Sequence, residues 1–348
     1  MTPRSAASAP IVITGTAGFI GFHVARRLLA LGHRVVGVDG FTDYYDVGLK
    51  RARHSILADL PGFEERILML EDGDALRRLL AEAKPQIVVH LAAQAGVRYS
   101  LDNPRAYIDS NVLGTFNVLE GCRETPPTHL MMASTSSVYG DGEIVPFTEQ
   151  SESSRPVSLY AATKKATEVM AHSYAHLHDL PITALRFFTV YGPWGRPDMA
   201  LFKFTDAILH DREIEIYGEG HMSRDFTYID DLVDGIVGLL HQPPREASPA
   251  RDDKRSAPFR VINIGASQPI GLNEFVAAIE AALGRAARRK LLPMQPGDVR
   301  RTWADVSTLR GLVRHLQPTP LADGVRAFVD WYRDYYDASA PALTSSKA

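Results

Sequence analysis

Two side chains near the middle of the chain have the types and the spacing needed for proton transfer. Tyr160 and Lys164 stand four residues apart in the segment 158–166, which reads SLYAATKKA. On a helix this spacing places both side chains on one face, about one turn apart. Because an ammonium beside a phenol favours the phenolate, we expect Lys164 to lower the pKa of Tyr160 toward the working range. Such a tyrosine can take a proton from a substrate hydroxyl and return it.

The segments before this pair support a chemical role for it. Residues 134–140 read STSSVYG and are rich in hydroxyl groups, and a glycine-rich turn stands near the start of the chain. Without such context, a tyrosine and a lysine at this spacing more often belong to a solvated helix face. Whether the pair is catalytic or belongs to a solvated helix face therefore depends on the predicted elements around it.

The composition is that of a large protein without a strong net charge. The chain has 348 residues, 45% of them hydrophobic, which suffices for a large core or for two joined domains. The net charge of −3 gives no general attraction to nucleic acid or to an anionic membrane, so local cations must hold any anionic ligand. Cys122 is the one cysteine, which excludes an intrachain disulfide and a cysteine metal cluster. We expect Cys122 to be a small buried residue and expect no metal site.

No segment of the sequence predicts export or membrane insertion. Residues 1–10 are polar and alanine-rich, and no long apolar run precedes Ile11, so we expect no signal peptide. No stretch has the roughly 18 consecutive apolar residues of a membrane span. We therefore expect a soluble, cytoplasmic protein.

Short apolar runs alternate with amphipathic segments in the first third of the chain. The predicted strands lie at 11–13, 34–38, 67–70, 87–91 and 130–133, and the predicted helices at 19–31, 75–83 and 107–122. A further strand at 183–186 follows the helix of Tyr160. This alternation favours right-handed βαβ units and an α/β fold with a doubly wound parallel Rossmann sheet.

A glycine-rich turn links the first predicted strand to the first predicted helix. Residues 15–21 read GTAGFIG, with a glycine at every third position. Gly15 permits the tight turn, Gly18 lets a pyrophosphate approach the backbone, and Gly21 lets helix and strand pack closely. The first N–H groups of the helix are unpaired and face the phosphates. The turn therefore predicts a dinucleotide site.

The end of the second predicted strand indicates which dinucleotide binds. Asp39 stands there, and its carboxylate can accept hydrogen bonds from ribose hydroxyls and repel a 2′-phosphate. The next residue is Gly40, so no arginine follows at once to hold such a phosphate. The turn therefore favours NAD over NADP.

Beyond Arg186 the rhythm of the chain changes. Prolines and glycines crowd residues 191–197, and later elements have irregular spacing, with predicted helices at 201–209, 230–241 and 321–335. The helix at 230–241 could return to the first domain. We expect an NAD-binding Rossmann domain at 10–186 with a return around 226–264, a smaller interleaved α/β domain at 187–336, and a tail at 337–348. The proline-rich and charged segment 243–258 is typical of an exposed loop.

With the glycine spacing and the Tyr160–Lys164 pair, the chain resembles the extended short-chain dehydrogenase/reductase family. In that family Asp72 would match the acid beside the adenine. Asn111 would match an asparagine of the central helix, although it could equally be a satisfied polar group of the core. The cofactor contacts that the resemblance implies come from Gly15, Gly18, Phe19, Ile20, Gly21, Asp39, Asp72, Gly73, Leu91, Ala92, Ala93, Asn111, Tyr160, Lys164 and Phe188.

Five longer runs make the resemblance more specific, to UDP-glucuronate 4-epimerases. They are DYYDVGLK at 43–50, HLAAQAGVRY at 90–99, LRFFTVYGPWGRPDM at 185–199, RDFTYIDD at 224–231 and PMQPGD at 293–298. The resemblance covers nearly the whole chain apart from the two ends and the 243–258 segment. Gly40 is a departure, because relatives often place a polar residue there near the adenosine. A homodimer with a four-helix interface is also implied by the family.

The resemblance implies a set of substrate-binding residues. UDP-glucuronate carries two phosphates and a carboxylate, so its site should offer several cations or oriented donors. Arg196 with Thr189 would recognise the glucuronate carboxylate, and Arg224 would neutralise the diphosphate. Tyr217 would stack near the uracil, and Asp298 would meet the uridine ribose or nearby groups. The alternatives are surface salt bridges for the arginines, a packed aromatic for Tyr217 and a turn acid for Asp298.

The implied chemistry is an oxidation and a reduction at C4 of the sugar. Tyr160 would remove the C4 hydroxyl proton while a hydride passes to NAD, and Lys164 would bind the nicotinamide ribose. Thr135 matches the catalytic hydroxyl of the family, and the sequence leaves open whether Thr135 or Ser136 is the main partner of the C4 oxygen. The 4-keto sugar would turn over and take the hydride back on its other face, giving UDP-galacturonate with NAD still bound.

Two serines argue against neighbouring reactions. Relatives that decarboxylate the 4-keto intermediate carry a glutamate two residues after the catalytic threonine, and 4,6-dehydratases carry Asp-Glu after it; here these positions are Ser136 and Ser137. UDP-glucuronate decarboxylase is thus an alternative disfavoured by Ser137, and UDP-glucose 4-epimerase is disfavoured by Arg196. A dinucleotide-binding sensor without catalysis is the non-enzyme alternative, and it would need a broken Tyr160–Lys164 pair.

Overall fold

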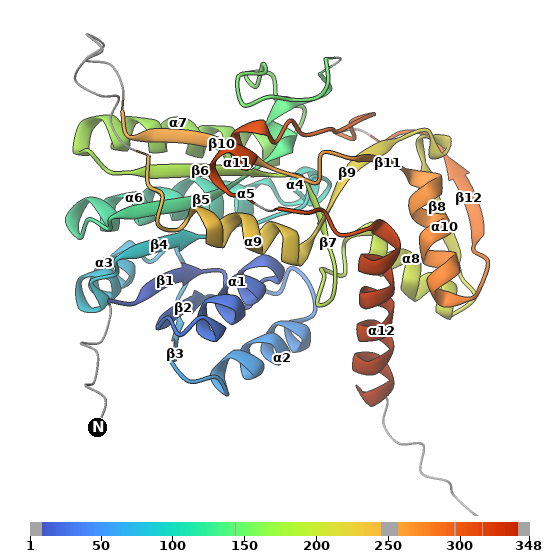
Figure 1. Ribbon diagram of the computed structural model, residues 1–348, viewed down its shortest axis with the longest axis horizontal. Helices are drawn as coiled ribbons and strands as arrows, with labels where there is room; N and C mark the ends of the chain where they lie inside the picture. The colour runs from blue at the N-terminus through green and yellow to red at the C-terminus, as the bar shows by residue number, and fades with distance from the viewer. Residues whose placement is uncertain (1–8, 143, 245–256, 296, 315, 340–348) are drawn as a thin grey trace, which may run out of the picture.

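A parallel sheet of seven strands organises the fold (Figure 1). The computed structural model describes residues 9–339 except 143, 245–256, 296 and 315, so most of the predicted 243–258 loop and the last residues of the predicted tail lie outside the described part. The strands are β1 (Ile11–Thr14), β2 (Val35–Asp39), β3 (Phe63–Ile67), β4 (Ile87–His90), β5 (His129–Thr135), β6 (Ile182–Phe187) and β10 (Phe259–Ile264). Their order is β10-β6-β5-β4-β1-β2-β3, and all pairings are parallel.

The strand order reverses beside β1, whose neighbours are β2 on one side and β4 on the other. The first connection leads outward from β1 to β2 and β3, whereas the later ones lead through β4, β5 and β6 on the opposite side. In open α/β sheets, ligands bind outside the carboxyl ends of the strands at such a reversal. The fold thus places the end of β1, with the glycine turn, at the expected position for a ligand.

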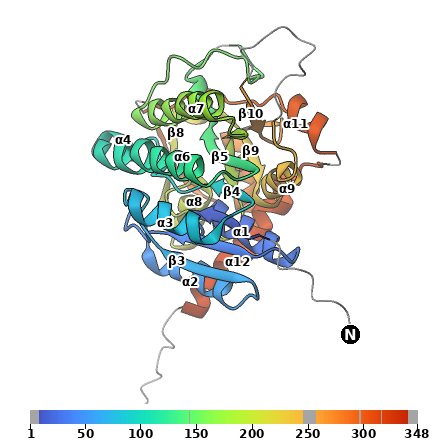
Figure 2. The ribbon, with the colours of Figure 1, turned by 90° about the vertical axis from the view of Figure 1, so that its left-hand side faces the viewer.

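Helices cover both faces of this sheet, as Figure 2 shows. One face carries α1 (Phe19–Ala30), α2 (Val47–Ala58) and α9 (Ile229–Leu239), and the other carries α3 (Gly73–Ala83), α6 (Gly114–Glu124) and α7 (Leu159–His178). The residues of β1 alternate between the two cores, with Ile11 and Ile13 in one and Val12 in the other. This alternation is the period of two of a strand that is buried on both faces.

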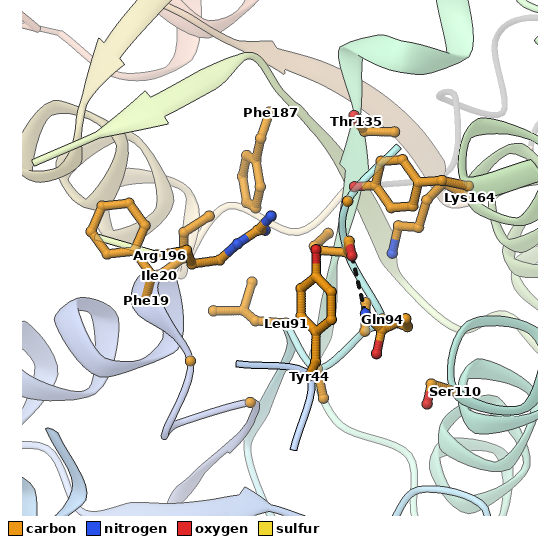
Figure 3. Close-up of a pocket in the computed structure, with 18 of the residues that line it drawn as sticks. Phe19, Ile20, Tyr44, Leu91, Gln94, Ser110, Thr135, Lys164, Phe187 and Arg196 are labelled. Atoms are coloured by element: carbon orange, nitrogen blue, oxygen red, sulfur yellow. Dashed lines mark hydrogen bonds between the residues drawn. The ribbon is translucent and has the colours of Figure 1, made fainter. Parts of the chain in front are cut away.

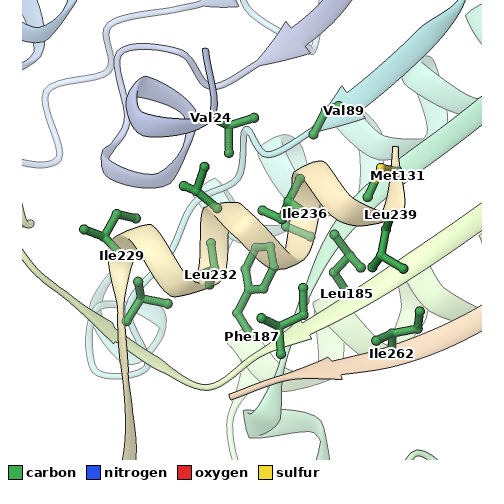
Figure 4. Packing of buried hydrophobic residues seen from close by; sticks show 14 of the residues in the cluster. Val24, Val89, Met131, Leu185, Phe187, Ile229, Leu232, Ile236, Leu239 and Ile262 are labelled. Atoms are coloured by element: carbon green, nitrogen blue, oxygen red, sulfur yellow. The ribbon is translucent and has the colours of Figure 1, made fainter. Parts of the chain in front are cut away.

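Helix α9 brings a late part of the chain back to the large sheet (Figure 4). Its residues Leu232 and Ile236 are fully buried and belong to the same core as Val89 of β4 and Leu185 of β6. Burying a leucine or isoleucine side chain contributes about 1.5–3 kcal/mol, so this face of α9 is held firmly. The strand β10 then pairs with β6 and completes the sheet.

The remaining elements form a smaller α/β part next to the carboxyl ends of the strands of the large sheet (Figure 1). The strands β7 (Thr189–Tyr191), β9 (Ser223–Tyr228) and β11 (Pro269–Gly271) form one small sheet, and β8 (Glu213–Tyr217) and β12 (Arg288–Leu292) form another. The helices α8 (Ala200–Leu209), α10 (Leu272–Leu283) and α12 (Leu321–Ser339) pack around them. Its core is aromatic; Phe226 and Phe275 stack with ring centroids 4.0 Å apart.

The predicted strand at 67–70 is wrong, since the strand of this region is β3 at Phe63–Ile67. Strand β3 is the edge strand, pairs only with β2 and reads FEERI, with most side chains partly or fully exposed. An exposed edge strand lacks the apolar run that marks a buried strand. The prediction therefore falls on the apolar residues just after β3. Leu68 and Leu70 do pack against a core, but from a loop.

The other predicted elements of the sheet and its helices are confirmed, with two refinements. The predicted helix at 107–122 is α5 (Pro104–Tyr107), a π-helical segment η1 (Ile108–Leu113) and α6 in succession. Helix α2 has no counterpart in the predictions, because buried polar residues such as Lys50, Arg53 and His54 break its apolar pattern. Within the described residues, no helix is long and apolar enough to cross a membrane, and no group of acids, histidines or cysteines could hold a metal ion.

Candidate active site

A cavity of about 420 Å³ lies at the carboxyl ends of the strands, between the large sheet and the smaller part of the chain (Figure 3). The segments that follow β1, β2, β4, β5 and β6 all contribute to its lining. Thr189, Arg196, Arg224 and Asp298 line it from the side of the smaller part. The cavity therefore gathers most of the residues that the sequence nominated.

The glycine turn at the start of α1 is shaped so that its backbone faces the cavity. Gly15 has a φ of +83°, and a Cβ on it would lie 2.7 Å from the backbone nitrogen of Ala92. A Cβ on Gly21 would lie 2.0 Å from the carbonyl oxygen of Gly15, so α1 can approach β1 only with glycine there. Gly18 lines the cavity just before the first residues of α1, Phe19 and Ile20, which line it too. Such a bare turn before a helix fits a pyrophosphate.

Asp39 ends β2 beside this turn, as predicted, and its carboxylate lines the cavity. Its two oxygens accept hydrogen bonds from the backbone nitrogens of Ala17 (2.9 Å) and Phe41 (2.8 Å). Each carboxylate oxygen can accept a further bond, so ribose hydroxyls can still be bound there. The combination of the bare turn and this acid fits the adenosine half of NAD.

The structure corrects the predicted position of a second acid at this end of the cavity. Asp72 and Gly73 do not line the cavity, whereas Glu71 and Met69 do. The side chain of Asp72 instead accepts a hydrogen bond from the backbone nitrogen of Ala75 (3.0 Å) and caps α3. Two neighbouring acids cannot be told apart by sequence when one of them also suits a helix start. Glu71 is thus the acid that faces this end.

Gly40 sits next to the same wall. A Cβ at this position would lie 2.1 Å from the Sδ atom of Met69, which lines the cavity. The absence of a side chain at this position therefore leaves room for Met69, an apolar side chain of the cavity wall.

Asn111 lies in η1 and is fully buried outside the cavity lining. Its Oδ1 accepts from the backbone nitrogen of Gln94 (2.8 Å), and its Nδ2 donates to the carbonyl oxygen of Gln94 (3.1 Å) and to Thr163 Oγ1 (3.1 Å). These bonds use its polar capacity within the chain, so it is a satisfied core group. It holds the loop after β4, whose residues Leu91, Ala92 and Ala93 line the cavity.

Tyr160 and Lys164 lie on the first turns of α7, and both line the cavity. The helix begins at Leu159 because Ser158 caps it, with its Oγ atom accepting from the backbone nitrogen of Ala161 (3.2 Å). Lys164 is 2% exposed. The last residue of β5, Thr135, and the two residues after it, Ser136 and Ser137, add their side chains to the lining.

The pKa of Tyr160 departs from the expectation that Lys164 would lower it. Burial raises this pKa, and the opposing influences are a hydrogen bond with Thr135 and the charge of Arg196. Burial also lowers the pKa of Lys164 to about 8, against the opposing charge of Glu168. Desolvation disfavours the charged form of both groups and is the largest influence on each pKa. The pair thus relies on Thr135 and Arg196 to favour the phenolate.

Arg196 reaches the cavity from a strained turn. Trp194 has a φ of +61°, in the left-handed region that residues other than glycine rarely adopt. Arg53 of α2 is completely buried and donates to the carbonyl oxygens of Trp194 (2.7 Å) and Gly195 (3.3 Å). It also donates to the carbonyl oxygen of Ala17 (2.9 Å) in the glycine turn. One buried side chain therefore ties the predicted cofactor turn to the turn that carries Arg196.

The guanidinium of Arg196 points into the cavity toward Tyr44, across from Thr135 and Lys164 (Figure 3). It forms a two-bond ion pair with Asp198, with distances of 2.9 Å from Nε to Oδ1 and 2.6 Å from Nη2 to Oδ2. Burial opposes its charge, but the carboxylate of Asp198 prevails and raises the pKa of Arg196. The cation is therefore permanent and held in one orientation.

The far end of the cavity is lined by Arg224 and Asp298. Asp298 pairs with Arg98 (3.1 Å), whose guanidinium lies 4.4 Å from the centre of the Tyr217 ring. Tyr217 itself does not line the cavity, and its hydroxyl donates to Glu215. The structure thus places Arg224 and Asp298 at the cavity and Tyr217 one layer behind, where Arg98 separates it from Asp298.

Several lining residues were not singled out from the sequence. Tyr44 comes from the segment between β2 and α2, Lys50 comes from the first turns of α2, and Gln94 comes from the loop after β4. Lys50 donates to Thr42 Oγ1 (2.9 Å) and lies over the ring of Tyr45 (4.6 Å). Their signal was present, because they belong to the runs DYYDVGLK and HLAAQAGVRY, but a run of letters does not say which side chain faces a ligand.

The acids of the lining lie away from the tyrosine. Among the described residues that line the cavity, the carboxylates are Asp39, Glu71 and Asp298. The first two stand at the adenosine end, and Asp298 stands at the end of Arg224. Beside Tyr160 the side chains of the 134–137 segment end in hydroxyls. The site can therefore exchange a proton through Tyr160 but has no lining acid next to it to work on a neighbouring carbon.

Comparison with known proteins agrees with this geometry. A model of the NAD dependent epimerase/dehydratase family matches residues 11–265. The chain belongs to this family. It is a member of the extended short-chain dehydrogenase/reductases, and the NAD dependence of the family accounts for the glycine turn and Asp39.

Individual members of the epimerase/dehydratase family resemble the chain over almost its whole length. A probable UDP-glucuronate 4-epimerase of Rhizobium meliloti (strain 1021) is 56% identical over 331 residues, which are 93% of this chain and 97% of that protein. UDP-glucuronate 4-epimerase 1 of Arabidopsis thaliana is 44% identical over 337 residues, 95% of this chain and 78% of that protein.

A solved structure extends the likeness to three dimensions. It is UDP-glucuronic acid 4-epimerase from Bacillus cereus in complex with UDP-glucuronic acid and NAD. Its TM-score is 0.85 at 33% identity, with 94% of this chain and 100% of that chain covered. The fold of this chain is therefore shared with an enzyme whose structure was solved in complex with UDP-glucuronic acid and NAD.

Proposed function

We propose that the protein interconverts UDP-glucuronate and UDP-galacturonate by oxidising C4 of the sugar and reducing it again on the other face. The observation that carries the proposal is the position of Arg196, a permanent cation that enters the cavity across from Thr135 and Lys164, in a cavity that Tyr160 also lines. A sugar that presents C4 to Tyr160 can present a C6 carboxylate to Arg196. The names of the relatives, and the uronic acid in the Bacillus cereus complex, support the same substrate.

The cofactor side of the cavity fits NAD in the way described above. We propose that the turn of Gly15, Gly18 and Gly21 holds the pyrophosphate, that Asp39 binds the adenosine ribose, and that Lys164 binds the nicotinamide ribose. Leu91, Ala92, Ala93 and Phe188 would line the ring systems. When bound, NAD supplies an acceptor for the C4 hydride and gives the hydride back in the second half of the reaction.

Tyr160 is the group we propose to move the proton. Its phenolate takes the proton of the C4 hydroxyl during oxidation, and the phenol returns it to the C4 oxygen during reduction. The hydrogen bond with Thr135 lowers the pKa of Tyr160 against the effect of burial, so Thr135 favours the basic form. This contact supports Thr135 over Ser136 as the main hydroxyl partner, although both side chains line the cavity.

The carboxylate makes the intermediate fragile. A 4-ketouronate is a β-keto acid, and loss of carbon dioxide breaks its C5–C6 bond and leaves the electron pair in an enolate of the C4 ketone. The bond breaks easily only when it is aligned with the π system of the carbonyl. We propose that Arg196, with Thr189, holds the carboxylate out of this alignment. Ser137 stands where decarboxylating relatives carry glutamate, so no acid in this segment assists at C5.

The remaining binding roles follow the two ends of the cavity. We propose that Arg224 neutralises the diphosphate and that Asp298 meets the uridine ribose. Tyr217 would act through Arg98, which lies between its ring and Asp298. In this arrangement residues 10–186, with the return around 226–264, hold NAD, and residues 187–336 hold the nucleotide sugar.

We also propose a homodimer, formed by the helices α6 and α7. Apolar side chains are exposed on and beside these helices, including Phe116 (41%) of α6 and Val169 (59%) of α7. Two copies of a helix pair with such faces can bury them as a four-helix interface. Light scattering should give the mass of two chains for the native protein and of one chain for Val169→Glu; a native monomer would refute this part.

The proposed reaction can be tested without adding a cofactor. The purified protein is incubated with UDP-glucuronate, UDP-glucose or UDP-galactose, and the products are identified by NMR. The proposal predicts UDP-galacturonate from the first and little conversion of the other two. UDP-pentose as the sole product would support a decarboxylase, and preferred conversion of the neutral hexoses would support a UDP-glucose 4-epimerase. No conversion even with NAD added would leave the non-catalytic sensor.

A further inference from the structure

The proposed carboxylate-binding arginine already holds a carboxylate of its own chain. Asp198 receives two parallel hydrogen bonds from Arg196, at 2.9 and 2.6 Å, and the two side chains are similarly exposed, at 22% and 23%. Arg196 lines the cavity, and Asp198 lies behind it. An arginine without an acidic partner would attract an anion more strongly. The pairing of Arg196 with Asp198 therefore suggests a role other than attraction.

Asp198 is itself held by a second residue. The hydroxyl of Tyr44, which lines the cavity, donates to Asp198 Oδ2 (3.1 Å). The charge of Arg196 outweighs burial and lowers the pKa of Asp198, so the carboxylate stays ionised near neutral pH. Burial and the same carboxylate raise the pKa of Tyr44, which keeps its hydroxyl a donor. Asp198 thus accepts hydrogen bonds from both sides, one from Tyr44 and two from Arg196.

These hydrogen bonds determine which edge of the Arg196 guanidinium remains available to a ligand. A guanidinium has five N–H groups in a planar fork. Asp198 occupies the edge formed by Nε and Nη2, and no hydrogen bond of Nη1 is found in the described part of the chain. Nη2 also donates to Met199 Sδ (3.8 Å), a weak acceptor. The edge formed by Nη1 and Nη2 can therefore still donate two bonds to another carboxylate. A ligand acid would then lie in the plane that Asp198 defines.

The pair also changes what kind of anion is recognised. Arg196 and Asp198 together are neutral, so they add little long-range attraction for a substrate that already carries a diphosphate. Binding then depends on the geometry of the two N–H groups on the edge between Nη1 and Nη2. A planar carboxylate at the right distance satisfies this geometry, and a hydroxymethyl group does not.

We propose that Asp198 and Tyr44 are positioning residues that orient Arg196, and that they limit its attraction for the uronate carboxylate while securing the retention of that carboxylate during the reaction. This inference rests on the proposed function and deepens it. Without Asp198, Arg196 would attract the substrate acid more strongly but hold it in more than one orientation. Some orientations align the C5–C6 bond with the C4 carbonyl and allow carbon dioxide to leave.

The test uses the nearly isosteric variant Asp198→Asn. We expect the KM for UDP-glucuronate not to rise, kcat for epimerisation to fall about tenfold, and the share of decarboxylated product to increase severalfold, because a displaced reacting group costs rate rather than binding. Tyr44→Phe should change all three in the same direction but less. A purely structural role would lower stability without changing the product ratio.

Matched controls exist elsewhere on the chain. Asp234→Asn removes the acid of another arginine–aspartate pair, Arg27–Asp234 (2.6 Å), neither member of which lines the cavity. Tyr332→Phe removes a hydroxyl that donates to Asp206 (2.9 Å), a tyrosine–aspartate bond like that of Tyr44. Both controls should keep the product ratio of the native protein.

A binding measurement separates this inference from the proposed reaction. Calorimetry gives the ratio of the affinities for UDP-glucuronate and UDP-glucose, and this ratio should rise severalfold in Asp198→Asn, because the charge of Arg196 is no longer neutralised. An unchanged or lower ratio would overturn the inference whether or not the native protein turns over. If the native protein makes UDP-galacturonate but Asp198→Asn behaves like Asp234→Asn, only the inference fails. If the native protein makes none, the proposed function fails, and the ratio still decides the inference.

Discussion

Arg53 donates a 2.7 Å hydrogen bond to the carbonyl oxygen of Trp194, the residue that takes the left-handed turn before Arg196. A left-handed conformation of a residue other than glycine costs of the order of 1–3 kcal/mol and persists only where the surroundings enforce it. The same guanidinium binds the carbonyl oxygen of Ala17 in the glycine turn. The loop of the proposed substrate arginine and the loop of the proposed cofactor site thus share one buried anchor.

Replacing this anchor should affect both sites together. In Arg53→Met the carbonyl oxygens of Ala17, Trp194 and Gly195 lose their partner, and a buried unsatisfied group costs about 1–3 kcal/mol. We expect the free energy of unfolding to fall by about 3 kcal/mol or more and the purified protein to retain less NAD. Thermal unfolding and the nucleotide released on denaturation measure these effects. Arg51→Met, an exposed position on the same helix, should change neither; loss of stability with full NAD retention would contradict the coupling.

Tyr160→Phe should abolish turnover and leave the fold intact. A positioned acid or base typically contributes a factor of about 10²–10⁴, so we expect a loss of this size in kcat with NAD and UDP-glucuronate still bound. Tyr174→Phe is the control on the same helix, since its hydroxyl donates to Glu120 away from the cavity. Equal activity of the two variants would exclude Tyr160 as the proton carrier.

Thr135 and Ser136 can be separated by the pH dependence of the rate. The hydrogen bond with Thr135 lowers the pKa of Tyr160, so Thr135→Val should raise that pKa. The acidic limb of the kcat profile, where the rate falls because Tyr160 is protonated, should then move to higher pH. Ser136→Ala should leave the limb in place. A shift in Ser136→Ala alone would reverse the assignment.

The sequence predicts the architecture well because the buried parallel strands appear in it as short apolar runs. It misses β3, whose charged and partly or fully exposed residues Glu64, Glu65 and Arg66 carry no such signal, and α2, whose buried side chains are partly polar. Whether a polar group is buried depends on partners that lie far along the chain. Arg53, for example, meets acceptors 36 and 141 residues away.

The candidate site shows the same division. Spacing and resemblance identify Tyr160, Lys164 and Arg196, because these positions belong to recognisable runs. They do not distinguish Glu71 from Asp72, since either could face the cavity until the start of α3 is known. The bond of Asp198 to Arg196 and the raised pKa of Tyr160 are likewise absent from the sequence, because both follow from burial and from the orientation of side chains in the folded protein.

Buried histidines should make the fold sensitive to mild acid. Burial lowers the pKa of His23 and of His90 to about 3 and that of His129 to about 4, against 6.5 in the unfolded chain. Because the native state keeps these groups neutral, their contribution is complete above pH 6.5 and is lost as the pH falls below it. Between pH 7.5 and 5.5 each should cost about 1.4 kcal/mol of the free energy of unfolding.

Urea unfolding at several pH values measures this loss. Stability should fall by on the order of 4 kcal/mol between pH 7.5 and 5.5 for the three histidines together. His129→Gln should reduce the slope by about one third, whereas His221→Gln, at an exposed position, should leave it unchanged. A native protein that is equally stable at both pH values would contradict the burial of these groups.

In the proposed reaction one hydride and one proton move at C4, and C5 is left untouched. Isotope exchange tests this reaction course directly. The reaction is run with UDP-glucuronate in D₂O without added NAD, and the products are examined by proton NMR. We expect UDP-galacturonate with protium at both C4 and C5, because the hydride leaves C4 and returns to it, and no group removes the C5 proton. Deuterium at C4 or C5 of UDP-galacturonate, or a UDP-pentose deuterated at C5 as the main product, would contradict it.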